Sequence, residues 1–287
     1  MIYDSIIIGA GPAGIVAALQ MKRSGLHVVL FEKGEIGGLL RNANCVENYL
    51  GFPDGISGRE LICSFQDHLC RHKVPTIREE VVEIGKDGAV FSVRTSGHTY
   101  FSSTVVIATG TAPKKAGIKG EEECCGSRLF NEAADLPADG QQHAVLVIGG
   151  GDAAFDYALN LSERGYVPTI VMRDSVSCLP LLKMRVEKKG VHIVEHMPVA
   201  RISLGVGQLE VHCLSECFQA DYVLIAAGRE PRYPRITAKD RKGLYFVGDV
   251  RSGSYRQVHI ATGDALHAAM EISHFLSSHS QYETKLQ

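Results

Sequence analysis

Three glycines near the start of the chain, Gly9, Gly11 and Gly14, have the spacing of a turn that binds the phosphates of a dinucleotide. In such a turn the first glycine permits a tight bend and the second lets a pyrophosphate approach the backbone, while the third lets helix and strand pack closely. The N–H groups that begin the following helix then face the negative phosphates. Glu32 lies where a carboxylate can accept hydrogen bonds from a ribose diol. This pattern predicts a dinucleotide site.

A second glycine turn repeats the pattern as Gly149, Gly151 and Ala154, with alanine as an allowed third residue. The strand expected after it ends without an acidic residue and is followed by Arg173. A guanidinium there can bind the 2′-phosphate of NADPH, which slightly favours NADPH over NADH. The alternative, in which Arg173 is a solvated side chain and the nicotinamide is NADH, stays open.

Predicted elements place both turns between a strand and a helix. Residues 3–8 form a β-branched apolar run, and residues 12–24 have apolar side chains at helical spacing. Residues 144–148 and 152–164 repeat this strand and helix. The strand predicted at 244–247 has no obvious neighbour in the second half, so we expect the chain to return to its first domain at the end. The sequence therefore predicts an α/β protein with two β–α–β units.

Composition and charge exclude several classes of protein. Hydrophobic residues make up 45% and charged residues 22%, and the net charge is −2, so a nucleic acid or an anionic membrane is not expected as a partner. No run reaches the about 18 apolar residues that span a bilayer, and no basic segment precedes the first strand. We expect a cytoplasmic protein without a membrane span or a metal site. Its eight cysteines are expected to be free thiols, and none are spaced C-x-x-C.

Taken in order, the motifs resemble the thioredoxin reductase branch of the FAD/NAD(P)-dependent pyridine nucleotide-disulfide oxidoreductase family. The resemblance covers nearly the whole chain and rests on residues 9–14, Glu32, Gly37–Gly38, 47–53, 108–110, 149–154, Gly248–Asp249 and Arg256–Gln257. It implies two Rossmann-like, three-layer β/β/α dinucleotide-binding domains, the second inserted into the first. Residues 1–113 and 236–287 would bind FAD and residues 114–235 would bind NADPH or NADH, in a homodimer.

The resemblance also implies roles for individual residues. Asp249 would hydrogen-bond the ribityl chain, Arg256 and Gln257 would lie at the flavin with a helix N-terminus behind them, and Asn48 would lie near the isoalloxazine. The residues expected at FAD are Gly9, Gly11, Pro12, Ala13, Gly14, Glu32, Gly38, Leu39, Asn48, Val82, Ala108, Thr109, Gly110, Gly248, Asp249, Arg256, Gln257 and Val258. Those expected at the nicotinamide are Gly149, Gly151, Asp152, Ala153, Ala154, Arg173 and Gly228.

The chain departs from the family in the segment that carries the redox dithiol. Thioredoxin reductases have a C-A-T-C-like pair just before the second strand and glycine turn, but residues 131–143 contain no cysteine. Cys124 and Cys125 are adjacent, and such a pair closes only a strained ring. We therefore expect an FAD-dependent NAD(P)H oxidoreductase whose acceptor is not thioredoxin but a ferredoxin or flavodoxin, a quinone or a small disulfide.

Two alternatives remain open at this point. One is a thioredoxin reductase-type disulfide reductase that uses Cys45, seven residues after Gly38, or another thiol. The other is a flavin-binding redox sensor with a degraded nicotinamide site. Residues 229–242 hold six basic and two acidic side chains, which could steer an acidic partner protein or could be a solvated linker.

Overall fold

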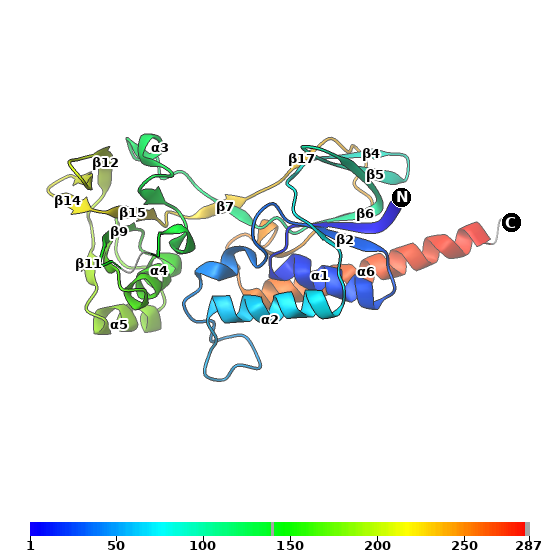
Figure 1. Cartoon of the computed structure of the whole chain (residues 1–287), viewed down its shortest axis with the longest axis horizontal. Coiled ribbons are helices and arrows are strands. Elements are labelled where there is room, and N and C mark those ends of the chain that lie inside the picture. Colours follow the sequence, from blue (N-terminus) through cyan, green and yellow to red (C-terminus); the bar gives the residue numbers. More distant parts are fainter. Residues whose placement is uncertain (139–140, 285–287) are drawn as a thin grey trace. The chain divides into compact units, whose positions relative to one another are not determined.

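The computed structural model describes residues 1–138 and 141–284 and divides the chain into two compact units (Figure 1). Unit 1 consists of Met1–Arg41, Glu47–Ala112 and Glu230–Gln287, and unit 2 consists of Asn42–Val46 and Pro113–Arg229. The sequence placed the divisions after residues 113 and 235 and did not anticipate that Asn42–Val46 would join unit 2.

Unit 1 is built on an eight-stranded sheet whose centre is parallel. β1 (Ile2–Ile8) lies between β2 (Val28–Phe31) and β6 (Thr99–Ile107), with Ile6 opposite Val29 and Val105. The order is β17-β4-β5-β6-β1-β2-β3, with β18 paired to β6. The remaining strands are β3 (Thr76–Ile77), β4 (Val81–Asp87), β5 (Val90–Thr95), β17 (Arg235–Ile236) and β18 (Leu244–Phe246). Since β18 joins this sheet, the chain returns to its first domain as expected.

Helices cover the sheet of unit 1. α1 (Pro12–Arg23) packs against both α2 (Gly58–Arg71) and α6 (Val258–Thr284), and the three run side by side (Figure 1). Ser57 and Glu60 form the capping box that begins α2, because each side chain satisfies the backbone N–H of the other. Two 3₁₀ helices, η1 (Gly38–Asn42) and η3 (Gly248–Val250), each begin with a glycine of positive φ.

Unit 2 has a five-stranded parallel sheet in the order β11-β10-β9-β15-β8. Its core contains the fully buried Phe155 together with Val147, Ile170 and Leu224. The strands are β8 (Leu129–Phe130), β9 (Ala144–Ile148), β10 (Val167–Val171), β11 (His192–Val194) and β15 (Tyr222–Ile225), and the helices are α3 (Glu121–Cys124), η2 (Ala133–Asp135), α4 (Asp152–Glu163) and α5 (Pro180–Lys188).

A three-stranded antiparallel sheet of β12 (Val199–Leu204), β13 (Leu209–Cys213) and β14 (Cys217–Ala220) packs on the parallel sheet of unit 2. Ile202, Leu209 and Val211 share a buried cluster with Ile148 and Val223, so unit 2 has two sheet layers and a helix layer. Two further strands, β7 (Thr111–Pro113) and β16 (Arg229–Pro231), lie where the chain passes between the units. Within the described residues, no helix is long and apolar enough to cross a membrane, and no group of acidic, histidine or cysteine side chains could hold a metal ion.

Candidate functional site

The first glycine turn connects β1 to α1 and leaves no room for side chains at two of its glycines. A Cβ on Gly14 would lie 1.8 Å from the carbonyl oxygen of Gly9. A Cβ on Gly9, whose φ is +101°, would lie 2.4 Å from the carbonyl oxygen of Ala108. These close approaches explain why both positions are glycine, and they show that Ala108 and Thr109 lie beside the turn.

Gly11 differs, because a Cβ there would meet no atom of the chain within 4 Å. It is the N-cap of α1, which has no side-chain cap and begins with Pro12 and Ala13. The first N–H groups of a helix lack partners within the helix. The open space beside Gly11 and this uncapped helix start fit the pyrophosphate of a dinucleotide such as FAD.

Glu32 follows β2 and points its carboxylate at the glycine turn. It accepts hydrogen bonds from the Ala10 N–H at 2.7 Å and from the Gly34 N–H at 2.8 Å. Each carboxylate oxygen has a further lone pair, so the ribose diol that the sequence assigned to Glu32 can still be bound. The carboxylate therefore both braces the turn and can bind a ribose.

Sequence reasoning missed two basic residues near Glu32. Arg232 donates its N–H to the carbonyl oxygen of Gly110 at 3.1 Å and its guanidinium to Glu80 at 2.7 Å, while Thr109 donates its hydroxyl to the Arg232 carbonyl. Burial, reinforced by the charge of Arg232, lowers the pKa of Lys33. The signal for Arg232 in the sequence was the basic composition of residues 229–242, in which Arg229 and Arg235 also pair with glutamates. This pairing favours the linker interpretation of that segment over electrostatic steering.

Gly38 is held against the same turn from the other side. The Gly37 N–H donates to the carbonyl oxygen of Ala10 at 2.8 Å, and a Cβ on Gly38 would lie 3.3 Å from Cα of Gly11. Leu39 follows in η1, whereas Val82 lies in β4 and is partly exposed.

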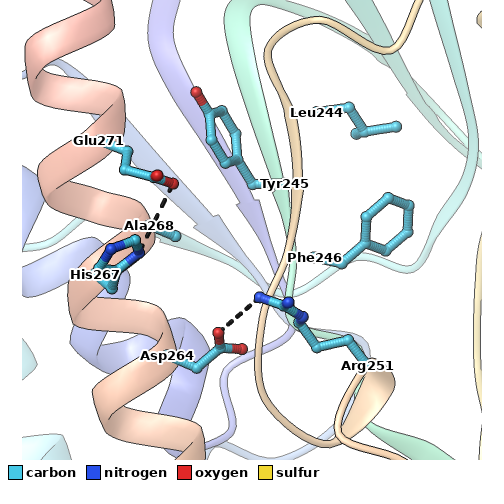
Figure 2. A pocket seen from close by; sticks show the side chains of 8 residues that line it. All are labelled: Leu244, Tyr245, Phe246, Arg251, Asp264, His267, Ala268 and Glu271. Atoms are coloured by element: carbon cyan, nitrogen blue, oxygen red, sulfur yellow. Dashed lines mark hydrogen bonds and ion pairs between the residues drawn. The ribbon is translucent and has the colours of Figure 1, made fainter.

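The Gly248–Asp249 turn also packs against the start of α1, because a Cβ on Gly248 would lie 2.8 Å from Cβ of Ala13. Asp264 of α6 supports this turn, because it accepts the Gly248 N–H at 2.8 Å. Asp264 also pairs with Arg251 at 2.8 Å (Figure 2). The pair lines a pocket of about 370 Å³ between α6 and β18. Asp264, which the sequence analysis did not single out, therefore fixes the turn that carries Asp249.

Asn48 and Gln257 meet although they are far apart in the chain. The Asn48 side-chain amide donates to Oε1 of Gln257 at 2.9 Å. Gln257 lies just before Val258, the first residue of α6, and its carbonyl oxygen accepts the Ala261 N–H. The structure thus joins two residues that the resemblance placed at the flavin, and Arg256 directly precedes Gln257.

The second glycine turn, in unit 2, has the same construction. A Cβ on Gly149 would lie 2.6 Å from the carbonyl oxygen of Ala226, and the third position, Ala154, is fully buried. Gly151 is the N-cap of α4, which begins with Asp152 and Ala153 and has no side-chain cap. Gly228 has a positive φ of 106°, and its carbonyl oxygen accepts the Lys114 N–H at 3.0 Å.

The loop after β10 braces this second turn through contacts that the sequence did not reveal. The N–H and hydroxyl of Ser177 both donate to the Gly150 carbonyl, at 2.9 and 3.1 Å. The Leu179 N–H donates to the Asp152 carboxylate at 2.8 Å. Arg173, earlier in the same loop, is 79% exposed and pairs with Asp174 at 2.9 Å.

Replacing Arg173 tests its proposed contact with a 2′-phosphate. We expect Arg173→Ala to raise the KM for NADPH about tenfold, the lower end for a charge-assisted hydrogen bond, because the side chain is exposed and Asp174 competes for it. Asp174→Asn should lower the KM for NADPH. Steady-state kinetics with NADPH and NADH measure both, and equal changes for the two nicotinamides would show that Arg173 does not read the phosphate.

All eight cysteines lie in the described part of the chain, and none of them forms a disulfide there. Cys124 is buried, which raises the pKa of its thiol, whereas its neighbour Cys125 is exposed. Cys45 is exposed and lies in Asn42–Val46, the short segment of the chain that belongs to unit 2.

Residues 131–143, where the resemblance predicts a dithiol, instead contribute a buried carboxylate. Glu132 accepts hydrogen bonds from the side-chain amide of Asn42 at 2.6 Å and the hydroxyl of Tyr157 at 3.1 Å, and it pairs with Arg229 at 2.6 Å. A hydrogen-bonded carboxylate in this position has no redox chemistry, so the described residues of this segment offer no thiol relay. Residues 139–140 lie outside the described residues.

Known proteins place the chain among pyridine nucleotide-disulphide oxidoreductases, whose family model matches residues 3–237. The chain is 31% identical to the thioredoxin reductase of Bacillus subtilis over 303 residues, which cover 96% of this chain and 95% of that protein. The thioredoxin reductase structure of Lactococcus lactis has a TM-score of 0.86 at 27% identity and covers 96% of this chain and 99% of its own. That of T. acidophilum has a TM-score of 0.83 at 30% identity and covers 94% and 97%.

The motif order, the two glycine turns and these similarities agree on fold and cofactors. The two-Rossmann α/β prediction is confirmed, as is the prediction of FAD and a reduced nicotinamide as cofactors. Since its relatives are thioredoxin reductases, the comparisons favour the disulfide reductase alternative over the other acceptors that we expected first. The chain therefore belongs to the pyridine nucleotide-disulphide oxidoreductase family and is a flavin-dependent NAD(P)H oxidoreductase.

Proposed function

We propose that unit 1 binds FAD along the first glycine turn, that unit 2 binds NAD(P)H along the second, and that the enzyme reduces a small disulfide through Cys45. FAD, when bound, supplies a two-electron carrier between the nicotinamide and the acceptor. The observation that carries the choice of thiol is the anchoring of Cys45. This exposed cysteine is held in a fixed segment, whereas residues 131–143 contain no cysteine.

Contacts on the N-terminal side of Cys45 fix the segment. The Asn44 N–H donates to the Asp156 carboxylate at 3.0 Å, and the Asn42 side chain donates to Glu132 and accepts the Ala134 N–H at 3.0 Å. Asn42 and Val46 are buried, so the segment is anchored on both sides of the exposed thiol. A fixed, accessible thiolate is what nucleophilic attack on a disulfide requires.

The chemistry of a single thiol balances with a small disulfide, RSSR. The Cys45 thiolate attacks one sulfur, a Cys45–S–S–R bond forms, and RS⁻ leaves. Two electrons that originate in NAD(P)H, with two protons, then convert this mixed disulfide into the Cys45 thiol and a second RSH. No second protein cysteine is needed, which fits the lack of a C-x-x-C pair in the sequence.

A general thioredoxin reductase activity is not expected. Attack on thioredoxin by a dithiol relay needs a resolving cysteine within reach of the first, and the segment that would carry such a pair contributes Glu132 instead. Turnover of thioredoxin should therefore stay near background even where a small disulfide is reduced.

A second candidate is direct transfer from the flavin to a ferredoxin, a flavodoxin or a quinone. The absence of any C-x-x-C pair in the sequence favours it, because such acceptors need no protein thiol. The acceptor panel below separates the two candidates. A homodimer and a cytoplasmic location stay predictions.

The test combines anaerobic reduction by NADPH and NADH with a panel of acceptors: glutathione disulfide, an aromatic disulfide, oxidised thioredoxin and benzoquinone. We expect Cys45→Ser to lower disulfide turnover at least about 100-fold, because a hydroxyl does not replace the thiolate nucleophile, and to leave benzoquinone reduction unchanged. Cys63→Ser, which changes another exposed cysteine in α2, is the matched control and should behave as wild type. Equal disulfide turnover by wild type and Cys45→Ser would remove Cys45 from the mechanism, and turnover of benzoquinone alone would select the second candidate.

A further inference from the structure

A loop of unit 1 is fastened to the start of α6 by two hydrogen bonds that run in parallel. Asn48 donates its side-chain amide to Gln257 at 2.9 Å, and the Leu50 N–H donates to Nε2 of His259 at 3.0 Å. Residues two apart on the loop thus meet residues two apart at the start of α6, of which Gln257 directly precedes the helix and His259 lies in its first turn. We call Asn48, Tyr49, Leu50, Gln257 and His259 the loop clasp.

Ring stacking fixes the imidazole in the loop clasp. The His259 ring lies on the Tyr49 ring with centroids 4.5 Å apart and an angle of 27° between the planes. Tyr49 in turn meets the edge of Phe65 of α2 at 6.0 Å. Burial raises the pKa of Tyr49, so the facing ring is a neutral phenol at physiological pH. Within the described residues the His259 side chain has no acidic partner; its hydrogen bond comes from Leu50 and its ring contact from Tyr49.

The hydrogen bond from Leu50 defines the protonation state of His259. To accept an N–H, Nε2 must carry a lone pair, so the imidazole is neutral with its proton on Nδ1. A protonated imidazole donates from both nitrogens and cannot accept. Protonation therefore replaces the bond to Leu50 with two N–H groups that face each other, while the stacking on Tyr49 can persist.

We propose that His259 is a positioning residue for the flavin site: its neutral imidazole holds the loop on α6, keeps Asn48 and Gln257 in register, and releases Leu50 on protonation. This inference rests on the proposed placement of the flavin at Asn48 and Gln257. It makes the approach of the loop to the flavin dependent on pH through a residue that need not touch the flavin itself.

Two substitutions of His259 separate its role as a hydrogen-bond acceptor for the Leu50 N–H from its ability to be protonated. Glutamine at position 259 has an oxygen that can accept the Leu50 N–H but has no group that titrates. Leucine removes the acceptor at every pH. His259→Gln is therefore the conservative variant that rescues the hydrogen bond, and His259→Leu is the variant that lacks it. Tyr49→Phe keeps the stacked ring and serves as the control for the phenol.

Hydrogen exchange of the Leu50 amide in the purified FAD-bound protein measures the hydrogen bond to His259 independently of enzyme activity. We expect the protection factor of this amide, corrected for intrinsic exchange, to fall about three- to tenfold in wild type and Tyr49→Phe between pH 8 and pH 5. It should be equal at the two pH values in His259→Gln and low at both in His259→Leu. An unchanged protection factor in wild type, or a fall of the same size in His259→Gln, would overturn the proposal.

Single-turnover reduction of the flavin by NAD(P)H tests whether the loop clasp affects the flavin site. The rate in wild type should fall on acidification relative to His259→Gln by a similar factor, and rates at pH 8 should agree. If the rate of flavin reduction falls by the same factor on acidification in wild type and in His259→Gln, the positioning role of His259 is wrong. Loss of FAD or of reduction at pH 8 in wild type would instead contradict the proposed function, so the two failures are distinguishable.

Discussion

Gly11→Ala is expected to remove FAD from the protein while leaving unit 1 folded. The backbone at Gly11 has φ −76° and ψ −179°, which any residue can adopt, and a Cβ there would meet no atom within 4 Å. The methyl group would instead fill the space in which we place the pyrophosphate. We expect FAD affinity to fall at least about 100-fold, because contacts between backbone N–H groups and phosphate are charge-assisted.

Two further glycine variants make this result specific. Gly14→Ala places a Cβ 1.8 Å from the Gly9 carbonyl oxygen, so it should lose both FAD and folding stability. Gly97→Ala, in the hairpin between β5 and β6 with nothing within 4 Å of its Cβ, should lose neither. Flavin absorbance of the purified proteins and unfolding of the apoproteins measure the two effects. A full complement of FAD in Gly11→Ala would rule out the proposed pyrophosphate position.

Asp156→Asn is expected to stabilise unit 2 at pH 7. Burial raises the pKa of Asp156 from 3.8 to about 6, against the opposing effect of the hydrogen bond from the Asn44 N–H. The folded state therefore binds this proton more tightly than the unfolded state does. The stabilising contribution is fully present below pH 3.8 and is lost as the pH rises through about 6. Above that pH the buried charge costs about 3 kcal/mol.

An asparagine oxygen can still accept the Asn44 N–H but carries no charge. The free energy of unfolding of Asp156→Asn should therefore exceed that of wild type by up to about 3 kcal/mol at pH 7 and approach it at pH 4. Chemical denaturation at the two pH values measures this difference. Glu163→Gln, which removes an exposed carboxylate whose charge acts on Asp156, should have a much smaller effect. A gain that is the same at both pH values would contradict burial as its cause.

Local patterns explain what could be predicted from the sequence. The glycine spacings, the β-branched runs and the capping residues Ser57 and Glu60 act over a few positions, so they could be recognised without tertiary information. Glu32 could be found because it directly follows the second predicted strand, whose end lies beside the glycine turn. The family resemblance rests on the same short patterns.

Contacts between distant parts of the chain could not be predicted in this way. Asp264 supports Gly248, and Arg232 reaches Glu80, only because packing brings their elements together. The basic composition of residues 229–242 left open whether this segment steers an acidic partner or is a solvated linker, and it did not reveal that Arg229, Arg232 and Arg235 have carboxylate partners in other segments. The electron acceptor could not be predicted from the sequence either. The missing dithiol argues against electron transfer to thioredoxin through a C-x-x-C pair, but it does not identify another acceptor.

Unit 2 is not formed by one continuous stretch of the chain, because Asn42–Val46 belongs to it as well as Pro113–Arg229. A gene fragment encoding only residues 113–229 would supply Glu132 and Asp156 without the Asn42 amide and the Asn44 N–H that contact them. The carboxylates of Glu132 and Asp156 would then lose these hydrogen-bond donors, so a chimera that exchanges unit 2 between related enzymes should exchange these five residues as well.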